Sequence, residues 1–139
     1  MIFYTNWFET GIYTCTIYCT CMSVDVVWFK RDLRTRDHVP LLSASLSGRP
    51  VICLYILETE RLEQKDTDPI HIQWELDCAA DLSRTLNDSG AFLHYGLGDA
   101  TEVLEAIHLE HGIERLLSHE ETGNTWSYSR DISVSNFCK

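Results

Sequence analysis

The chain has 139 residues, with 21 acidic and 11 basic side chains and a formal net charge of -10. This length suits one domain or part of one. The negative charge disfavours binding to nucleic acid or to an anionic membrane unless positive side chains gather locally, and no apolar stretch has the length of a membrane span.

Residues 1–22 differ in composition from the rest of the chain. They carry a single charged side chain and hold three of the six cysteines. The positively charged start and apolar core of a secretory signal are absent, and Cys15, Cys19 and Cys21 have no histidine nearby to complete a zinc site. We therefore expect a disordered or loosely packed extension that precedes a folded domain over residues 23–139.

The first elements of that domain are two strands with a helix between them. Residues 24–29 form a short β-branched and aromatic run, which is typical of a buried strand. The helix is predicted to have Asp37 as its N-cap, Pro40 in its first turn and Gly48 in the left-handed position after its end. Residues 51–57 (VICLYIL) are continuously apolar, which indicates a central parallel strand covered on both faces.

A charged loop and a long helix are predicted next. Residues 58–68 are rich in charge and favour a loop, and Asp68 followed by Pro69 marks the start of a helix. Apolar side chains then recur at helical spacing, so one stripe of this helix faces the sheet. The stripe consists of Ile72, Leu76, Ala79, Leu82 and Leu86.

The remaining pattern repeats the strand and helix alternation. Residues 91–95 predict a third strand, and Asp99 caps a further helix that Gly112 ends. Residues 113–118 predict a fourth strand, and a last helix begins near Trp126. The alternation favours an α/β fold: a Rossmann-like parallel sheet of about four strands, incomplete, with helices on both faces.

Two unusual loops follow the first and fourth strands. In residues 30–37, six of eight positions are charged, and four of the chain's eleven basic side chains lie there. Residues 119–131 follow the fourth strand. Ligands of such sheets bind beyond the carboxyl ends of the strands, where the strand order reverses. We expect the two loops to face one another across that crevice.

The stretch VVWFKRDLRTRDHVPL resembles the opening of the photolyase/cryptochrome family, WFR-x-DLR-x-x-DN. His38 stands where the family usually has Asn, and the strand at 51–57 and the pair Arg130-Asp131 also fit. The resemblance covers about residues 23–139. The matching opening residues are Trp28, Phe29, Arg31, Asp32, Leu33, Arg34 and Asp37.

The resemblance implies a light-harvesting role for this domain. In the family, an N-terminal α/β domain carries an antenna chromophore in many members. A larger helical domain binds FAD and, in photolyases, damaged DNA. The chain resembles a fragment that stops before the helical domain. We therefore expect this chain alone to have no FAD site and no light-driven lyase activity. Contact with DNA is expected only through the helical domain, which is its partner in full-length relatives. No contact with a membrane is expected.

The identity of the antenna chromophore stays open. Folate-binding members carry an Asn-Glu pair where this chain has Trp126 and Ser127, which argues against folate bound in that manner. The alternatives that stay open are a deazaflavin, a flavin or no antenna chromophore. Trp126 and Tyr128 could stack on a flat ring or equally be half-buried helix residues. The candidate antenna-site residues are Phe29, Arg31, Asp32, Leu33, Arg34, Trp126, Tyr128, Arg130 and Asp131.

A structural role competes with ligand binding in the charged loop. Arg31 and Arg34 are expected to brace the two loops by pairing with Asp32, Asp37 or Asp131. Glu120 and Glu121 lack a partner nucleophile for acid-base catalysis, and His108 and His111 lack a third ligand for a metal, so solvated positions are expected for these four residues.

Two other classes of protein with the same fold fit the sequence less well. A stand-alone nucleotide-binding module of the universal-stress type would carry a glycine-rich phosphate loop, which is absent. A response-regulator-like domain needs an acidic pair after its first strand, where this chain has Lys30-Arg31. Cys53 and Cys78 lie in apolar periodic segments and are expected to be reduced, which favours a cytoplasmic protein.

Overall fold

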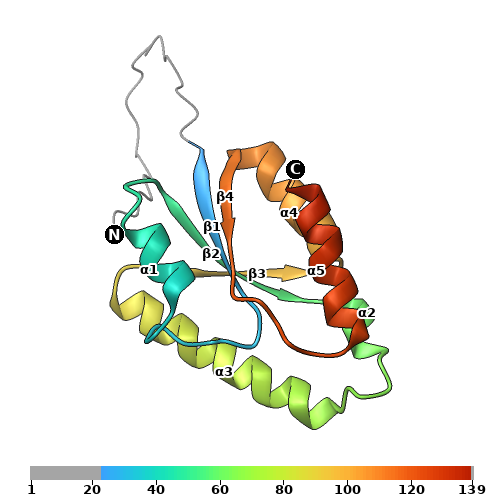
Figure 1. The fold of residues 1–139 in the computed structure, drawn as a ribbon. Helices are drawn as coiled ribbons and strands as arrows, with labels where there is room; N and C mark the ends of the chain where they lie inside the picture. The colour runs from blue at the N-terminus through green and yellow to red at the C-terminus, as the bar shows by residue number, and fades with distance from the viewer. Residues whose placement is uncertain (1–22, 139) are drawn as a thin grey trace, which may run out of the picture.

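A four-stranded parallel sheet forms the centre of the domain in the computed structural model, which describes residues 23–138 (Figure 1). The expected extension at 1–22 lies outside the described residues. The strands are β1 (Val24–Phe29), β2 (Val51–Leu57), β3 (Leu93–Leu97) and β4 (Ile113–Leu117), in the order β3-β2-β1-β4. The predicted α/β class is confirmed, and β1 and β4 are neighbours at the switch point as expected.

Helices cover both faces of the sheet (Figure 1). On one face lie α1 (Val39–Ser45) and α3 (Pro69–Asp88), and on the other α4 (Ala100–His111) and α5 (Thr125–Phe137). A further short helix, α2 (Thr59–Leu62), follows β2.

Alternation along the central strands divides the apolar side chains between two cores. Phe29 and Tyr55 point toward α1 and α3, whereas Trp28 and Leu54 point toward α4 and α5. Each of these four side chains is at most 2% exposed. The continuous apolar run of β2 is thus explained by burial on both faces, as the sequence predicts.

A buried carboxylate lies near the start of β1. Asp25 is fully buried, and Arg115 of β4 donates to it at 3.1 Å through Nε and 2.6 Å through Nη2. The hydrogen bonds from Arg115 hold the pKa of Asp25 below its usual range, against the opposing effect of burial. This pair ties β1 to β4 at the end of the sheet opposite the site described below.

The N-cap of α1 differs from the prediction. Asp37 has φ 50°, in the left-handed region, and the cap is His38, whose Nδ1 accepts from the N–H of Leu41 at 3.1 Å. Imidazole is an uncommon cap, which is why Asp37 was expected there. Gly48, at φ 74°, occupies the predicted left-handed position.

Two other expectations need correction. The segment 58–68, expected to be a loop, contains α2. The third strand begins at Leu93 and not at 91, because the N–H of Ala91 donates to the carbonyl of Leu86 and belongs to the end of α3. The caps Asp68 and Asp99 are confirmed.

Within residues 23–138, no helix combines the length and the apolar character that crossing a membrane requires.

Candidate functional site: a cavity beside a charged cluster

The loops that follow β1 and β4 meet at the carboxyl edge of the sheet. Lys30, just after β1, is only 7% exposed, and its Nζ lies 2.9 and 3.0 Å from the carboxylate oxygens of Asp131. The same Nζ donates to the carbonyl of His119 at 3.2 Å and lies 4.7 Å from the centre of the Trp28 ring. The predicted meeting of the two loops is confirmed by these contacts.

Arg130 is the centre of a buried ion-pair cluster. Its guanidinium lies over two indole rings, 4.8 Å from the centre of Trp28 and 5.4 Å from that of Trp126. It also pairs with three carboxylates: Glu58, Glu121 at 2.5 Å and Asp131 at 2.8 Å. We define this Arg130 cluster as Lys30, Glu58, Glu121, Arg130 and Asp131.

Burial affects the acid-base behaviour of the cluster. Burial of the Glu58 carboxyl raises its pKa to about 7, and the adjacent Arg130 opposes this effect without cancelling it. Arg31 lies outside the cluster on the exposed side and pairs with Glu121 at 2.8 Å. The expectation that an arginine of one loop pairs with an acidic group of the other is confirmed, but the partner of Arg31 is Glu121, which is 12% exposed and not solvated as expected. The expected pairing of Arg34 with an acidic group is wrong, because its guanidinium donates to backbone carbonyls.

A second polar group consists of Asp32, His38 and His119. The Oδ2 atom of Asp32 lies 2.6 Å from His119 Nδ1 and 2.7 Å from His38 Nε2, and its Oδ1 accepts from the N–H of Lys30 at 3.0 Å. Burial would raise the pKa of Asp32, but the imidazoles and this N–H outweigh it and hold the pKa well below its usual range.

The ligand types in this group are those of a metal site, but their atoms lie too close together to be ligands of one ion. Ligands about 2.0–2.2 Å from one zinc ion stand more than 3 Å apart, whereas Asp32 lies 2.6 and 2.7 Å from the two rings. His38 Nδ1 already accepts a backbone N–H, so the ring proton of neutral His38 belongs on Nε2 and leaves no lone pair there for a metal.

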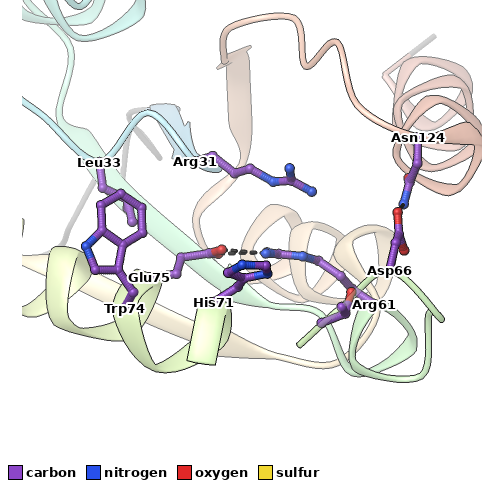
Figure 2. Close-up of a pocket in the computed structure, with 9 residues that line it drawn as sticks. Arg31, Leu33, Arg61, Asp66, His71, Trp74, Glu75 and Asn124 are labelled. Atoms are coloured by element: carbon purple, nitrogen blue, oxygen red, sulfur yellow. Dashed lines mark hydrogen bonds and ion pairs between the residues drawn. The ribbon is translucent and has the colours of Figure 1, made fainter. Parts of the chain in front are cut away.

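A cavity of about 250 Å³ lies beside these groups, between the loop after β1, α2 and the start of α3 (Figure 2). Its walls combine aromatic, apolar and cationic side chains. Trp74 is 70% exposed despite its size, and Figure 2 shows Arg31 reaching in from the opposite side of the cavity. The lining residues are Arg31, Leu33, Arg61, Asp66, Thr67, His71, Trp74, Glu75 and Asn124.

Buried hydrogen bonds fix the floor of the cavity. Arg61 donates to both carboxylate oxygens of Glu75, at 2.7 and 2.5 Å, and the Tyr55 hydroxyl donates to Glu75 at 2.8 Å (Figure 2 shows the arginine pair). Burial, with the negative charge of Glu75, raises the pKa of Tyr55. The buried Nε of Arg61 has no partner among the described residues, so one donor of the floor is unsatisfied.

The start of α5 closes one side of the cavity. Asn124 donates to Asp66 at 2.6 Å, and the indole N–H of Trp126 donates to Glu60 at 3.1 Å. These contacts join α5 to α2 and to the segment before α3, so parts of the chain about 60 residues apart form one concave surface. Such a surface at the carboxyl edge of a parallel sheet is a usual ligand site.

The sequence-predicted residues occupy several kinds of position. Arg31 and Leu33 line the cavity. Asp32, Arg130 and Asp131 take part in the polar networks beside it. Phe29 is fully buried in the core between β1 and α1.

The other three predicted residues do not line the cavity. Arg34 is exposed and bonds to carbonyls of its own loop. Trp126 stacks on Arg130, and Tyr128 is 65% exposed on α5. Whether any of the nine contacts a chromophore stays a prediction.

Sequence reasoning missed the part of the cavity formed by α2 and α3. Arg61 falls in the segment expected to be a charged loop, and His71, Trp74 and Glu75 were not singled out. The available signal was Trp74, a large aromatic residue away from the apolar stripe of α3, since such residues often mark binding surfaces.

Together the fold and the cavity define a Rossmann-like α/β domain with a cavity at the carboxyl edge of its sheet. The family model described as DNA photolyase matches residues 25–139. The chain therefore belongs to the DNA photolyase family, which includes the cryptochromes.

Curated relatives support this assignment. Cryptochrome DASH of Gloeobacter violaceus is 30% identical over 116 residues, which cover 79% of this chain and 23% of that protein. The deoxyribodipyrimidine photo-lyase of Agrobacterium fabrum is 34% identical over 95 residues, which cover 66% of this chain and 19% of that protein. The chain thus spans about a quarter or less of the relatives it matches.

Solved structures agree in fold. A cryptochrome from Synechocystis sp. PCC6803 superposes with a TM-score of 0.77 at 22% identity, covering 83% of this chain and 25% of that one. An archaeal photolyase from Sulfolobus tokodaii gives a TM-score of 0.71 at 22% identity, covering 83% of this chain and 26% of that one. That structure is described as holding two FAD molecules, with the implication of a novel light-harvesting cofactor. These findings give no support to the universal-stress alternative.

Proposed function

We propose that this domain holds the light-harvesting chromophore of a photolyase or cryptochrome, and that the chromophore binds in the cavity beside Trp74. The observation that carries the proposal is a concave site at the switch edge that pairs an exposed indole with fixed cationic side chains. An antenna chromophore needs a planar aromatic ring system, and an exposed indole offers such a ring a stacking surface.

The lining indicates the chemistry of the ligand. Trp74 and Leu33 offer apolar contact, while Arg31, Arg61 and His71 offer donors to an acceptor or an anionic group. The partnerless Nε of Arg61 is a further donor. The volume of about 250 Å³ lies slightly below the roughly 300–1,000 Å³ of drug-sized sites, which suits the ring system of a flavin better than a whole dinucleotide.

Flavin mononucleotide is a suitable probe. Titration with it, followed by calorimetry, should give saturable binding with one site per chain. Trp74→Ala should weaken binding by about tenfold, because one aromatic stacking contact contributes about 0.5–1.5 kcal/mol.

Tyr128→Ala is the matched control, since Tyr128 is an exposed aromatic residue on α5 that does not line the cavity. This variant should bind as the unaltered chain does. A larger loss from Tyr128→Ala than from Trp74→Ala would move the site to the surface of α5. Absence of binding by the unaltered chain at millimolar probe would refute the flavin assignment.

The remaining roles depend on the rest of a full-length relative. We propose that a helical FAD domain is the partner of this domain, that energy absorbed by the antenna passes to that FAD, and that any DNA contact belongs to the helical domain. A cytoplasmic location stays a prediction from cysteine content, and Cys53, Cys78 and Cys138 are free among the described residues.

A further inference from the structure

We propose that α1 and the end of α3 form a docking groove for an acidic amphipathic helix of a partner protein. The groove is separate from the cavity beside Trp74, since no residue lines both. The proposal therefore goes beyond the proposed function and does not depend on a chromophore.

The first observation is that α1 is apolar on two opposite sides. Its inner side is buried in the core through Leu41 and Ala44. Its outer side carries Val39, Leu42 and, at the C-cap, Leu46, which are 68%, 59% and 77% exposed. These three residues follow one another at i, i+3 and i+7, so they form one stripe. A helix that is apolar all round is normally buried, which indicates that a partner covers the outer stripe.

The second observation is a groove of about 520 Å³ beside this stripe, between α1 and the end of α3 (Figure 1). Val39 and Leu42 line it from α1, and Leu86 lines it from α3. Helices commonly dock by laying apolar side chains at i, i+3 and i+7 into such a groove. The concave shape suits a helix better than a lipid surface, into which a protruding apolar face inserts.

The third observation is the charge at the two ends of α1. Arg34 and Arg36 precede the helix, and Arg49 follows it. The guanidinium of Arg34 donates to backbone carbonyls, and Arg36 has no ion pair within residues 23–138. Arg49 lies 3.7 Å from Glu114 and 3.9 Å from Asp25, which are long distances for ion pairs. These cationic groups can therefore accept further anionic partners.

This positive surface stands out on an acidic chain. Residues 33–49 contain three basic side chains and a single acidic one, Asp37, whereas the whole chain has a net charge of -10. A partner helix with carboxylates on both sides of its apolar stripe matches the arginines at both ends of α1. The negative charge of the remaining chain opposes a nucleic acid or an anionic membrane as the occupant.

A second copy of this chain fits the groove less well. A two-fold contact places the same surface on both partners. Whether the two α1 helices ran parallel or antiparallel, the arginines at the ends of one would face arginines of the other, and like charges across an interface repel. An acidic helix meets no such repulsion, so it is the occupant that the charges favour.

Two synthetic helical peptides test the proposal on the whole chain. Both carry leucine at i, i+3 and i+7, and the flanking positions are glutamate in one peptide and lysine in the other. Calorimetry should show that the glutamate peptide binds about tenfold more tightly or better, and that salt reduces this preference. Absence of binding by the glutamate peptide, or equal affinity for the two peptides, would overturn the proposal.

Single substitutions test the two parts of the surface. Leu42→Glu should weaken binding of the glutamate peptide by about tenfold, and Arg36→Glu should weaken it as well, since it reverses a charge at the end of α1. Both side chains are exposed, so neither change disturbs the core. The matched controls are Leu109→Glu on α4 and Lys65→Glu before α3, which are also exposed. Equal losses in a variant and its control would contradict the proposed surface.

Amide chemical shifts locate the bound peptide without any substitution. The glutamate peptide should shift the amides of residues 35–46 and 86–89. Shifts centred on β4 or α5 instead would place the peptide elsewhere and refute the groove as its site.

Two further measurements decide against other occupants. Sedimentation velocity compares self-association of Leu42→Glu and Leu109→Glu, and flotation compares their binding to vesicles that contain anionic phospholipid. We expect the two variants to behave alike in both. If Leu42→Glu alone lost self-association or vesicle binding, the stripe would belong to a second copy or to a membrane, and the proposal would fail.

Discussion

At the scale of single residues, Arg130 joins segments that are far apart in the sequence. Its side chain is 7% exposed and pairs with Glu58 after β2, with Glu121 after β4 and with Asp131 next to it. A buried arginine in this position holds the carboxyl edge of the sheet together. The resemblance to the family marks Arg130 and Asp131, and the structure gives the pair a bracing role beside the cavity.

Arg130→Met should destabilise the domain by about 3–5 kcal/mol, because it leaves the buried Glu58 carboxyl without its counter-charge. Urea unfolding at pH 8 measures the change. Arg84→Met is the control: Arg84 and Asp81 are both 74% exposed, and such pairs contribute little. Equal unfolding midpoints for the two variants would show that the Arg130 cluster does not stabilise the fold.

The reactivity of single cysteine thiols tests how deeply each of them is buried. Cys53 is 1% exposed, and burial raises the pKa of its thiol to about 12, whereas Cys138 lies exposed at the end of α5. Because the thiolate is the reactive form, iodoacetamide at pH 8 should modify Cys138 and spare Cys53 until urea unfolds the chain. Peptide mass mapping measures both, and equal native rates would contradict the buried position of β2.

At the scale of elements, helix caps are locally encoded and can be tested singly. Asp99 accepts from the N–H of Thr101 at 2.7 Å and of Glu102 at 3.2 Å. Asp99→Ala should cost about 1 kcal/mol in unfolding free energy. Glu105→Ala, on the exposed face of the same helix, should change it far less, and thermal unfolding compares them. An Asp99→Ala variant with an unchanged unfolding free energy would show that the cap contributes nothing to stability.

The elements also show what a sequence can predict. Asp68, Asp99 and the strand 51–57 were predicted correctly because a cap or an apolar run acts within a few residues. The start of β3 depends on pairing with β2, and the cap of α1 depends on Asp32, which holds an imidazole in place. Such long-range contacts leave little trace in the local pattern.

The candidate site shows the same difference between features encoded locally and features that depend on long-range contacts. The meeting of the two loops was predictable because strand order fixes which loops are neighbours. The cavity was not, because Arg61 and Trp74 become neighbours only when α2 and α3 pack beside the loop after β1.

At the scale of the whole molecule, β4 pairs with β1 on one side only among the described strands. Its Leu116 and Leu117 are partly exposed, and an unpaired strand edge favours association between chains. We expect the isolated chain to associate reversibly as its concentration rises. Sedimentation velocity from micromolar to millimolar concentration measures this, and a monomer throughout would show that the edge is protected.

The central claim is that the cavity beside Trp74 receives a planar chromophore. The most direct test is a nuclear Overhauser experiment on the isotope-labelled chain with bound flavin mononucleotide. The proposal predicts contacts from the flavin ring protons to the side chains of Trp74 and Leu33. Contacts to Trp126 and Tyr128 instead, with none to Trp74, would contradict it.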